Sequence, residues 1–219
     1  MSRRRALMVA RQTPRIPDTY QEVEYITKPN ASSTDVYLRT GKRINNIYPT
    51  VFKGKFYPTA FGSSSGSGMS TCIKRSNNNG LPFGVNIKDG IGIRNGSSTT
   101  TSFFVSADTK NKIVEFAVTV TSDGFQLDGS IDGQPQTGTV QATPASWTAN
   151  ASDVLFLSSD YSGQSFAGRY YYAQVIQGGV PIIDLVPCYR KSDNKIGMYD
   201  LVSQTFMPVT GTWTKGADV

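Results

Sequence analysis

Apolar and polar residues alternate with a period of two along much of the chain. In residues 112–121, Val114, Phe116, Val118 and Val120 occupy every second position. Successive side chains of a strand point to opposite faces, so this alternation predicts a strand with one buried face. A helical stripe of apolar residues does not persist for three turns anywhere in the chain, which argues against long amphipathic helices.

Turn signals separate the apolar runs. Asn-Gly and Asp-Gly pairs favour tight hairpins because both residue types tolerate positive φ. The alternation resumes at Phe125 and Leu127 after Asp123-Gly124, which predicts a hairpin. The pairs are Asn79-Gly80, Asp89-Gly90, Asn95-Gly96, Asp123-Gly124, Asp128-Gly129 and Asp132-Gly133.

Short β-branched and aromatic runs recur between the turns and predict further strands. They span residues 20–26, 35–40, 50–57, 69–74, 83–87, 102–106, 154–157, 169–177, 182–189, 195–199 and 205–208. About a dozen short strands are too many for one flat open sheet. We therefore expect an all-β fold, a two-sheet antiparallel jelly-roll sandwich. Residues 20–219 would form this single domain, and residues 1–19 an arm that precedes it.

The positive charge is concentrated in the arm. The chain carries a formal charge of +6, and its first 15 residues hold five arginines and no acidic side chain. The remainder has 17 basic and 16 acidic residues, so the body offers no surplus for a basic nucleic-acid face. We expect no specific nucleic-acid partner for the body.

The arm combines its charge with a short apolar run and is expected to act as an anchor. Such a segment suits a protein groove that is acidic at its rim and apolar inside. The apolar run of the arm is too short for a signal peptide. No stretch of the chain reaches the ~18 apolar residues of a membrane span, so we expect no membrane partner. The predicted anchor residues are Arg3, Arg4, Arg5, Leu7, Met8, Val9, Arg11 and Arg15.

The composition excludes several kinds of chemistry. The chain has no histidine, which removes histidine-based triads and most zinc sites. Glu22 and Glu24 share a strand face and leave a glucanase-like glycoside hydrolase as a minor alternative. Asp123, Asp128 and Asp132 are explained by turn chemistry. We expect no catalytic residues, no metal and no cofactor.

Two cysteines, Cys72 and Cys188, are too few for a disulfide framework. Free buried thiols are the simpler interpretation, and a bridge between them stays open. The redox state of the pair is therefore not predicted.

Two loops offer aromatic and hydrogen-bonding side chains for a sugar. The candidate carbohydrate-binding residues are Trp147 and Asn150 in residues 144–152, and Asp160, Tyr161 and Gln164 in residues 158–165. The alternative is that these side chains have only a packing role within the loops. Arg169-Tyr170-Tyr171-Tyr172 is a second aromatic and basic stretch. On a strand Tyr171 would point opposite to both neighbours, so we interpret the trio as half core and half surface.

Both ends of the domain are similar to one family. YQEVEYI (residues 20–26) resembles the opening of concanavalin-like jelly-roll domains in phage and prophage structural proteins of gut bacteria. DLVPCYRKSDNKIGMYDL (residues 184–201) and GTWTKG (residues 211–216) resemble that family's closing motif. TKPNASSTDVYLRTG (residues 27–41) departs from the family pattern, so a ligand face in that region cannot be transferred.

The resemblance implies a non-enzymatic virion structural protein, either a capsid decoration or head fibre or a tail component. It would be made in the host bacterial cytoplasm, held by its arm to other virion proteins, and present in the particle as a homo-oligomer. The alternative is a receptor-binding module for a bacterial surface glycan. Within the closing motif, Pro187 is expected to end or edge a strand, and Tyr199 to start a return strand that meets Phe206.

Overall fold

A computed structural model of the chain describes residues 16–31, 38–44, 47–62, 69–74, 83–95, 102–144, 154–157 and 166–219. These residues contain strands and no helix, and no helix suited to crossing a membrane occurs among them. The strands are β1 (Tyr20–Glu22), β2 (Ile26–Lys28), β3 (Leu38–Arg43), β4 (Thr50–Phe61), β5 (Met69–Lys74), β6 (Phe83–Asn86), β7 (Gly90–Asn95), β8 (Ser102–Ser106), β9 (Val114–Val120), β10 (Phe125–Ile131), β11 (Gln134–Val140), β12 (Val154–Leu157), β13 (Phe166–Gln177), β14 (Val180–Arg190), β15 (Lys195–Asp200), β16 (Thr205–Pro208) and β17 (Thr214–Lys215).

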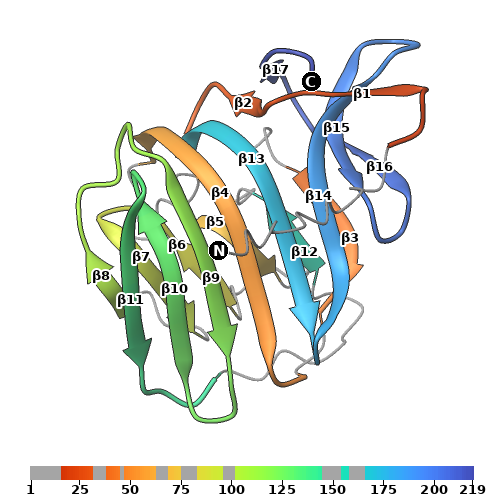
Figure 1. Cartoon of the computed structure of the whole chain (residues 1–219). Coiled ribbons are helices and arrows are strands. Elements are labelled where there is room, and N and C mark those ends of the chain that lie inside the picture. The colour runs from red at the N-terminus through yellow and green to blue at the C-terminus, as the bar shows by residue number, and fades with distance from the viewer. Residues whose placement is uncertain are drawn as a thin grey trace, which may run out of the picture.

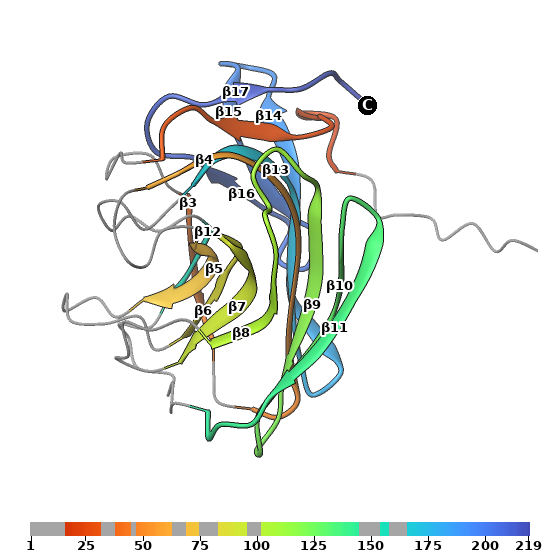
Figure 2. The ribbon, with the colours of Figure 1, turned by 90° about the vertical axis from the view of Figure 1, so that its left-hand side faces the viewer.

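The strands form two antiparallel sheets that pack face to face. The larger sheet follows the order β11-β10-β9-β4-β13-β14-β15-β16, with β1 paired to β14, and β2 paired to β13 and β17. The smaller sheet follows the order β3-β12-β5-β6-β7-β8. The larger sheet lies nearer the viewer in Figure 1, and Figure 2 shows the two layers from the side. The predicted two-sheet antiparallel jelly-roll sandwich is confirmed.

The core lies between the sheets, and every second side chain along most of β4 and all of β9 is buried in it. On β9 the buried positions are the predicted Val114, Phe116, Val118 and Val120. The Asp123-Gly124 hairpin is also confirmed, because Thr121 donates its backbone N–H to the carbonyl of Gly124 at 2.9 Å. Burial of these aliphatic and aromatic side chains is the main favourable term for the fold.

The predicted strands differ from the structure in four places. The predicted strand 20–26 is divided: residues 20–22 form β1, which pairs with β14, and only Ile26 belongs to β2, which pairs with β13. The two-residue strand β17 was not predicted. Also not predicted were β7, in which glycines replace alternate side chains, and β11, which is a polar edge strand. Neither strand carries the apolar alternation that marks a half-buried strand.

Of the two cysteines, Cys188 is a buried free thiol, as expected. The side chain of Cys72 and residues 1–15 of the predicted arm, which spans residues 1–19, lie outside the described residues. Ile16 belongs to the packed body, where it contacts a small cluster around Cys188 and Tyr199.

Candidate functional site

The outer face of the larger sheet carries aromatic and charged side chains at its centre. On β4, Phe52 and Phe56 are buried in the core. Lys53, Lys55 and Tyr57 alternate with them and therefore point outward. Strands β9 and β13 flank β4 (Figure 1). Their partly exposed side chains alternate with buried ones and belong to the same surface.

A β-bulge on β13 turns two consecutive tyrosines outward. Tyr170 is buried in the core, whereas Tyr171 and Tyr172 are both partly exposed. The pairing with β4 shifts register between Tyr170 and Tyr172, so Tyr172 lies opposite the outward Lys55. The predicted opposition of Tyr171 to its neighbours is right for Tyr170 and wrong for Tyr172, because the bulge inserts one extra residue.

The Arg169 guanidinium lies between two tyrosine rings. Its central carbon is 4.6 Å from the ring centroid of Tyr25 and 5.1 Å from that of Tyr57. A hydrogen bond with Tyr171 is the main cause that raises the pKa of Arg169, and the tyrosine phenols add to it. These contacts hold the cation and the rings in one arrangement.

Tyr171 joins Tyr25 to complete this surface. Their rings meet edge to face with centroids 5.4 Å apart. The Lys55 Nζ atom lies 5.6 Å from the ring centroid of Tyr171. We call Tyr25, Tyr57, Arg169 and Tyr171 the tyrosine–arginine face.

Two glycines allow the backbone to approach this face closely. Gly168 has a φ of +146°, and a Cβ there would lie 2.1 Å from the carbonyl oxygen of Tyr57. A Cβ on Gly216 would lie 3.0 Å from the ring of Tyr25. A side chain at Gly168 would push β13, which carries Arg169, away from Tyr57 on β4, and a side chain at Gly216 would displace the Tyr25 ring.

A polar hollow of about 270 Å³ adjoins the tyrosine–arginine face. Cross-strand pairing places Glu115 opposite Lys55 and Ala117 opposite Lys53, so the small side chain of Ala117 leaves space between larger ones. The hollow is lined by Lys53, Glu115, Phe116, Ala117, Asp128, Gly129, Ser130 and Tyr172.

Glu115 links the polar hollow to the tyrosine–arginine face. The Tyr172 hydroxyl donates a hydrogen bond to Glu115 Oε1 at 3.0 Å. The Lys55 Nζ lies 3.8 Å from Glu115 Oε2. Burial, followed by the charge of Glu115, raises the pKa of Tyr172, so its hydroxyl remains a donor throughout the physiological range.

A further polar pair continues across β13 and β14. Gln174 Nε2 donates to Asp184 Oδ2 at 3.0 Å. Burial raises the pKa of Asp184, while this hydrogen bond opposes the shift. The outer face therefore offers rings at one end and carboxylates, amides and hydroxyls toward the other.

This combination suits a ligand with apolar ring faces and polar edges. Aromatic rings pack against the flat C–H faces of such a ligand, whereas carboxylates and hydroxyls form hydrogen bonds with the donors and acceptors around its edge. A pyranose sugar has that construction. The arrangement also suits an elongated ligand, because the face and the hollow follow one another across the sheet.

The structure does not test the residues predicted for recognition. Trp147, Asn150, Asp160, Tyr161 and Gln164 all lie outside the described residues. The anchor residues of the arm, from Arg3 to Arg15, do so as well. Both sets stay predictions.

The two glutamates considered for glycoside hydrolysis lie away from the polar hollow. Glu22 and Glu24 are exposed on either side of the buried Val23, as their alternation suggested. Neither lines the hollow. Within the described ranges no group of three His, Cys, Asp or Glu side chains could hold a metal ion.

Part of the site was visible in the sequence but was not predicted to be a site. Arg169 and its tyrosines were visible as a basic and aromatic stretch. The missing signal was the partner strand, where Lys53, Lys55 and Tyr57 alternate with buried phenylalanines on the predicted strand 50–57. Reading the outward positions of both runs together would have found it.

Comparison with known proteins supports the fold. No protein-family model matches the sequence, and no curated protein matches it. A candidate carbohydrate-binding protein from Bacteroides ovatus matches with a TM-score of 0.52 and 9% identity, over 90% of this chain and 62% of that one. The extracellular region of zebrafish Gpr126/Adgrg6 matches with a TM-score of 0.52 and 11% identity, over 89% of this chain and 26% of that one.

A SAP-like pentraxin from Limulus polyphemus has a TM-score of 0.49 and 14% identity, over 73% of this chain and 77% of that one. The chain thus spans 62% of the Bacteroides ovatus protein and about a quarter of the receptor's extracellular region. At these identities the likeness concerns the fold. The chain has the fold of a two-sheet jelly-roll β-sandwich of the concanavalin-like kind, as the sequence predicted.

Proposed function

We propose that the protein is a non-catalytic glycan-binding module whose ligand lies on the tyrosine–arginine face. The observation that carries the proposal is the group of three partly exposed tyrosine rings around Arg169, beside a polar hollow. The candidate carbohydrate-binding protein that shares the fold supports the same class of function. This function corresponds to the glycan-binding alternative from the sequence, at a different site.

Preorganisation favours binding at this face. The Tyr25 ring is bounded by Arg169 on one side and by the backbone near Gly216, so it loses little freedom when a ligand arrives. Pairs of aromatic rings contribute about 0.5–1.5 kcal/mol beyond area burial, and we take the same order of magnitude for a sugar ring on a tyrosine. Two or three such contacts correspond to the modest affinity expected of a single glycan-binding module.

Hydrogen bonds from the polar hollow would give selectivity. Glu115 and Asp128 accept hydrogen bonds, and Ser130 and Tyr172 both have hydroxyl groups. A sugar whose ring stacks on the tyrosines would place its next unit over these groups. The proposal therefore expects oligosaccharides to bind more tightly than single sugars.

A glycan array, followed by calorimetric titration of the bound saccharides, tests the proposal. Tyr57→Ala and Tyr171→Ala should each reduce affinity about tenfold, since each removes one ring contact. Tyr48→Ala is the matched control, because Tyr48 is an exposed tyrosine outside the face. Absence of any saturable saccharide binding, or equal losses in all three variants, would contradict the proposal.

The virion setting remains a second proposal. It is supported by the similarity of the opening and closing motifs to phage and prophage structural proteins, with the basic arm as the anchor to other virion proteins. A glycan-binding body on a virion would serve attachment to a bacterial surface, so the two proposals are compatible. Removal of residues 1–15 should leave a folded body that no longer incorporates into particles, and normal incorporation would contradict the anchor.

A further inference from the structure

The cation of the tyrosine–arginine face has aromatic neighbours and, among the described residues, no acidic partner. The Arg169 guanidinium is partly exposed and lies between the rings of Tyr25 and Tyr57. None of the ion pairs in the described part of the chain involves it. Tyrosines raise its pKa, and the hydrogen bond with Tyr171 is the first cause. The positive charge of Arg169 is therefore not balanced by a described carboxylate.

Two lysines that also lie over tyrosine rings each have a carboxylate partner. Lys55 lies over one such ring, and its Nζ is 3.8 Å from Glu115 Oε2. Lys215 lies over another, and its Nζ is 2.7 Å from Asp218 Oδ1. A ring contact in this protein therefore occurs together with an ion pair at both lysines, and Arg169 departs from that arrangement.

Arg190 is a close counterpart of Arg169 with the opposite charge environment. Its guanidinium carbon lies 5.6 Å from the ring centroid of Phe206. Its Nε and Nη2 atoms donate to the two carboxylate oxygens of Asp193 at 2.9 and 2.6 Å. Both arginines thus have an aromatic neighbour, but the planar fork of Arg190 is already filled by a carboxylate.

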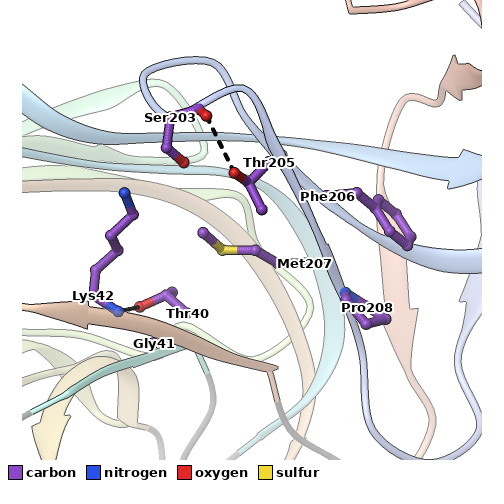
Figure 3. Close-up of a pocket in the computed structure, with 8 residues that line it drawn as sticks. All are labelled: Thr40, Gly41, Lys42, Ser203, Thr205, Phe206, Met207 and Pro208. Carbon is purple, nitrogen blue, oxygen red and sulfur yellow. Dashed lines mark hydrogen bonds between the residues drawn. The ribbon is translucent and has the colours of Figure 1, made fainter.

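The cation beside the pocket between β3 and β16 is also paired. This pocket has a volume of about 360 Å³, and Lys42 is among the residues that line it (Figure 3). The Lys42 Nζ lies 3.8 Å from Oδ2 of the fully buried Asp200. An anionic ligand is therefore better served by Arg169 than by this pocket.

We propose that the glycan bound at the tyrosine–arginine face is acidic and that its carboxylate pairs with Arg169. This inference rests on the proposed function, because it specifies the class of saccharide that the face selects. A guanidinium has five N–H donors in a planar fork that matches a carboxylate. Contacts with the tyrosine rings use none of these donors, so donors remain beyond the hydrogen bond with Tyr171.

The two rings beside Arg169 favour a carboxylate over a sulfate. A carboxylate that pairs bidentately lies in the plane of the guanidinium, so it needs little more thickness than the guanidinium itself. The Tyr25 and Tyr57 rings, centred 4.6 and 5.1 Å from the Arg169 carbon, leave room for such a planar group. A sulfate is tetrahedral and would be thicker. A uronic acid carries a planar carboxylate at the edge of its sugar ring, and that ring would lie against Tyr171.

The neighbouring sugar unit is expected to be neutral. Glu115 and Asp128 line the polar hollow beside the tyrosine–arginine face. A second carboxylate placed over the hollow would meet these like charges, which is unfavourable. Hydroxyl groups can instead donate hydrogen bonds to both acidic side chains. The expected ligand therefore carries an acidic unit at Arg169 and a neutral unit over the hollow.

A glycan array tests the inference when it pairs uronate-containing oligosaccharides with the same oligosaccharides after reduction of their carboxyl groups to alcohols. Calorimetric titration of the full-length protein then gives the ratio of the two affinities. The acidic form should bind about tenfold more tightly, as expected for a hydrogen-bonded charge pair. Oligosaccharides in which acidic and neutral units alternate should bind more tightly than those made of uronates alone.

Substitutions of Arg169 assign the preference to one side chain. Arg169→Gln should reduce the affinity ratio to about one, while binding of the reduced forms stays within about twofold of the wild type. Arg169→Lys should give an intermediate ratio, because an ammonium group lacks the planar fork. Arg190→Gln is the matched control and should leave the ratio unchanged, since its fork is occupied by Asp193.

The outcomes separate this inference from the proposed function. Equal binding of acidic and reduced forms, tighter binding of sulfated saccharides, or a ratio that persists in Arg169→Gln would overturn the inference and leave the glycan-binding module standing. Equal loss of both forms in Arg169→Gln would also overturn it, because Arg169 would then only position the rings. Tighter binding of uronate-only oligosaccharides would contradict the neutral unit. Absence of saturable binding to any saccharide would overturn the proposed function and the inference together.

Discussion

Two tyrosine clusters lie on the same outer face of the larger sheet, yet they differ in their neighbours. In the first, Tyr20 lies 5.2 Å from Tyr199 and 5.1 Å from Phe206, between ring centroids. Ile16 and Cys188 complete this closed cluster, and Tyr199 is only 4% exposed. The closed cluster thus behaves as a small satellite of the core.

The tyrosine–arginine face is the open counterpart. Its rings contact Arg169 and Lys55 in place of aliphatic side chains, and its tyrosines remain partly exposed. Burial raises the pKa of Cys188 to about 12 in the closed cluster, whereas the open cluster keeps a cation on its surface. Tyrosines packed by apolar neighbours stabilise the fold, and tyrosines framed by charges remain available for a ligand.

The largest expected effect is on stability at the closed cluster. Tyr199→Ala should lower the free energy of unfolding by about 3–5 kcal/mol, because it leaves a cavity beneath Tyr20. Tyr199→Phe keeps the ring and should cost far less. Chemical denaturation measures both. A Tyr199→Ala protein as stable as the wild type would remove the structural role assigned to this cluster.

The next effect concerns a charge beneath the open cluster. Lys28 is fully buried on β2, opposite Gly168, and desolvation lowers its pKa from 10.5 to about 8. Below pH 8 Lys28 is protonated in both the folded and the unfolded state, so the folded state is destabilised by the full cost of burying its charge. Between pH 8 and 10.5 only the unfolded state keeps the proton, and stability should rise with pH, by roughly 3 kcal/mol in total.

Comparison with Lys28→Met isolates that contribution. Cys188 lowers the stability as the pH rises above 9. Its pKa is raised in the folded state, so above pH 9 the thiol ionises in the unfolded state while it remains protonated in the folded state. The Lys28→Met variant retains the contribution of Cys188, which therefore cancels in the comparison. The free energy of unfolding of the wild type minus that of the variant should increase from pH 8 to 10.5. A difference that is flat over this window would contradict a buried Lys28 with a lowered pKa.

Tyr171→Ala provides the smaller, contrasting effect on the open cluster. Its stability should fall by no more than about 1 kcal/mol, because the lost contacts are at a partly exposed surface. Denaturation measured alongside Tyr199→Ala tests this contrast. A loss as large as that of Tyr199→Ala would mean that the open cluster is structural too.

The smallest effect is expected at the rim of the closed cluster. Arg190 lies over the Phe206 ring and forms an exposed ion pair with Asp193, whose pKa its hydrogen bond lowers to about 2. The associated stability is present above pH 3.8 and is lost as pH falls toward 2. Asp193→Asn should therefore flatten the acid limb of the stability curve only slightly. A large change at neutral pH would contradict this assignment.

Most of the sandwich could be predicted from alternation and turn chemistry, since the half-buried strands carry that signal directly. The pairing of Tyr199 with Phe206 was also foreseen from the closing motif. Pro187 was predicted to end or edge a strand and was wrong, because it lies inside β14. The Pro187 carbonyl accepts a hydrogen bond from the Val23 N–H, so the position of the missing N–H is on the same side of β14 as Val23. The pairing of β13 with β14 ends at Leu185, so no β13 residue needs that N–H.

The candidate site was harder to predict because it depends on register. The bulge that turns Tyr172 outward has no signature in the sequence, and it decides which side chains share the outer face. Tyr25 reaches Arg169 only because β2 pairs with β13, a contact between residues about 140 positions apart. Short-range periodicity cannot reveal such neighbours.

A map of the bound glycan tests the central claim most directly. Backbone amide shifts would be followed by NMR while the saccharide selected by the array is added to the wild-type protein. The account predicts saturable shifts at residues 55–57 and 168–172, with none around Tyr199 or Met207. Shifts confined to other parts of the chain would contradict the assignment of recognition to the tyrosine–arginine face.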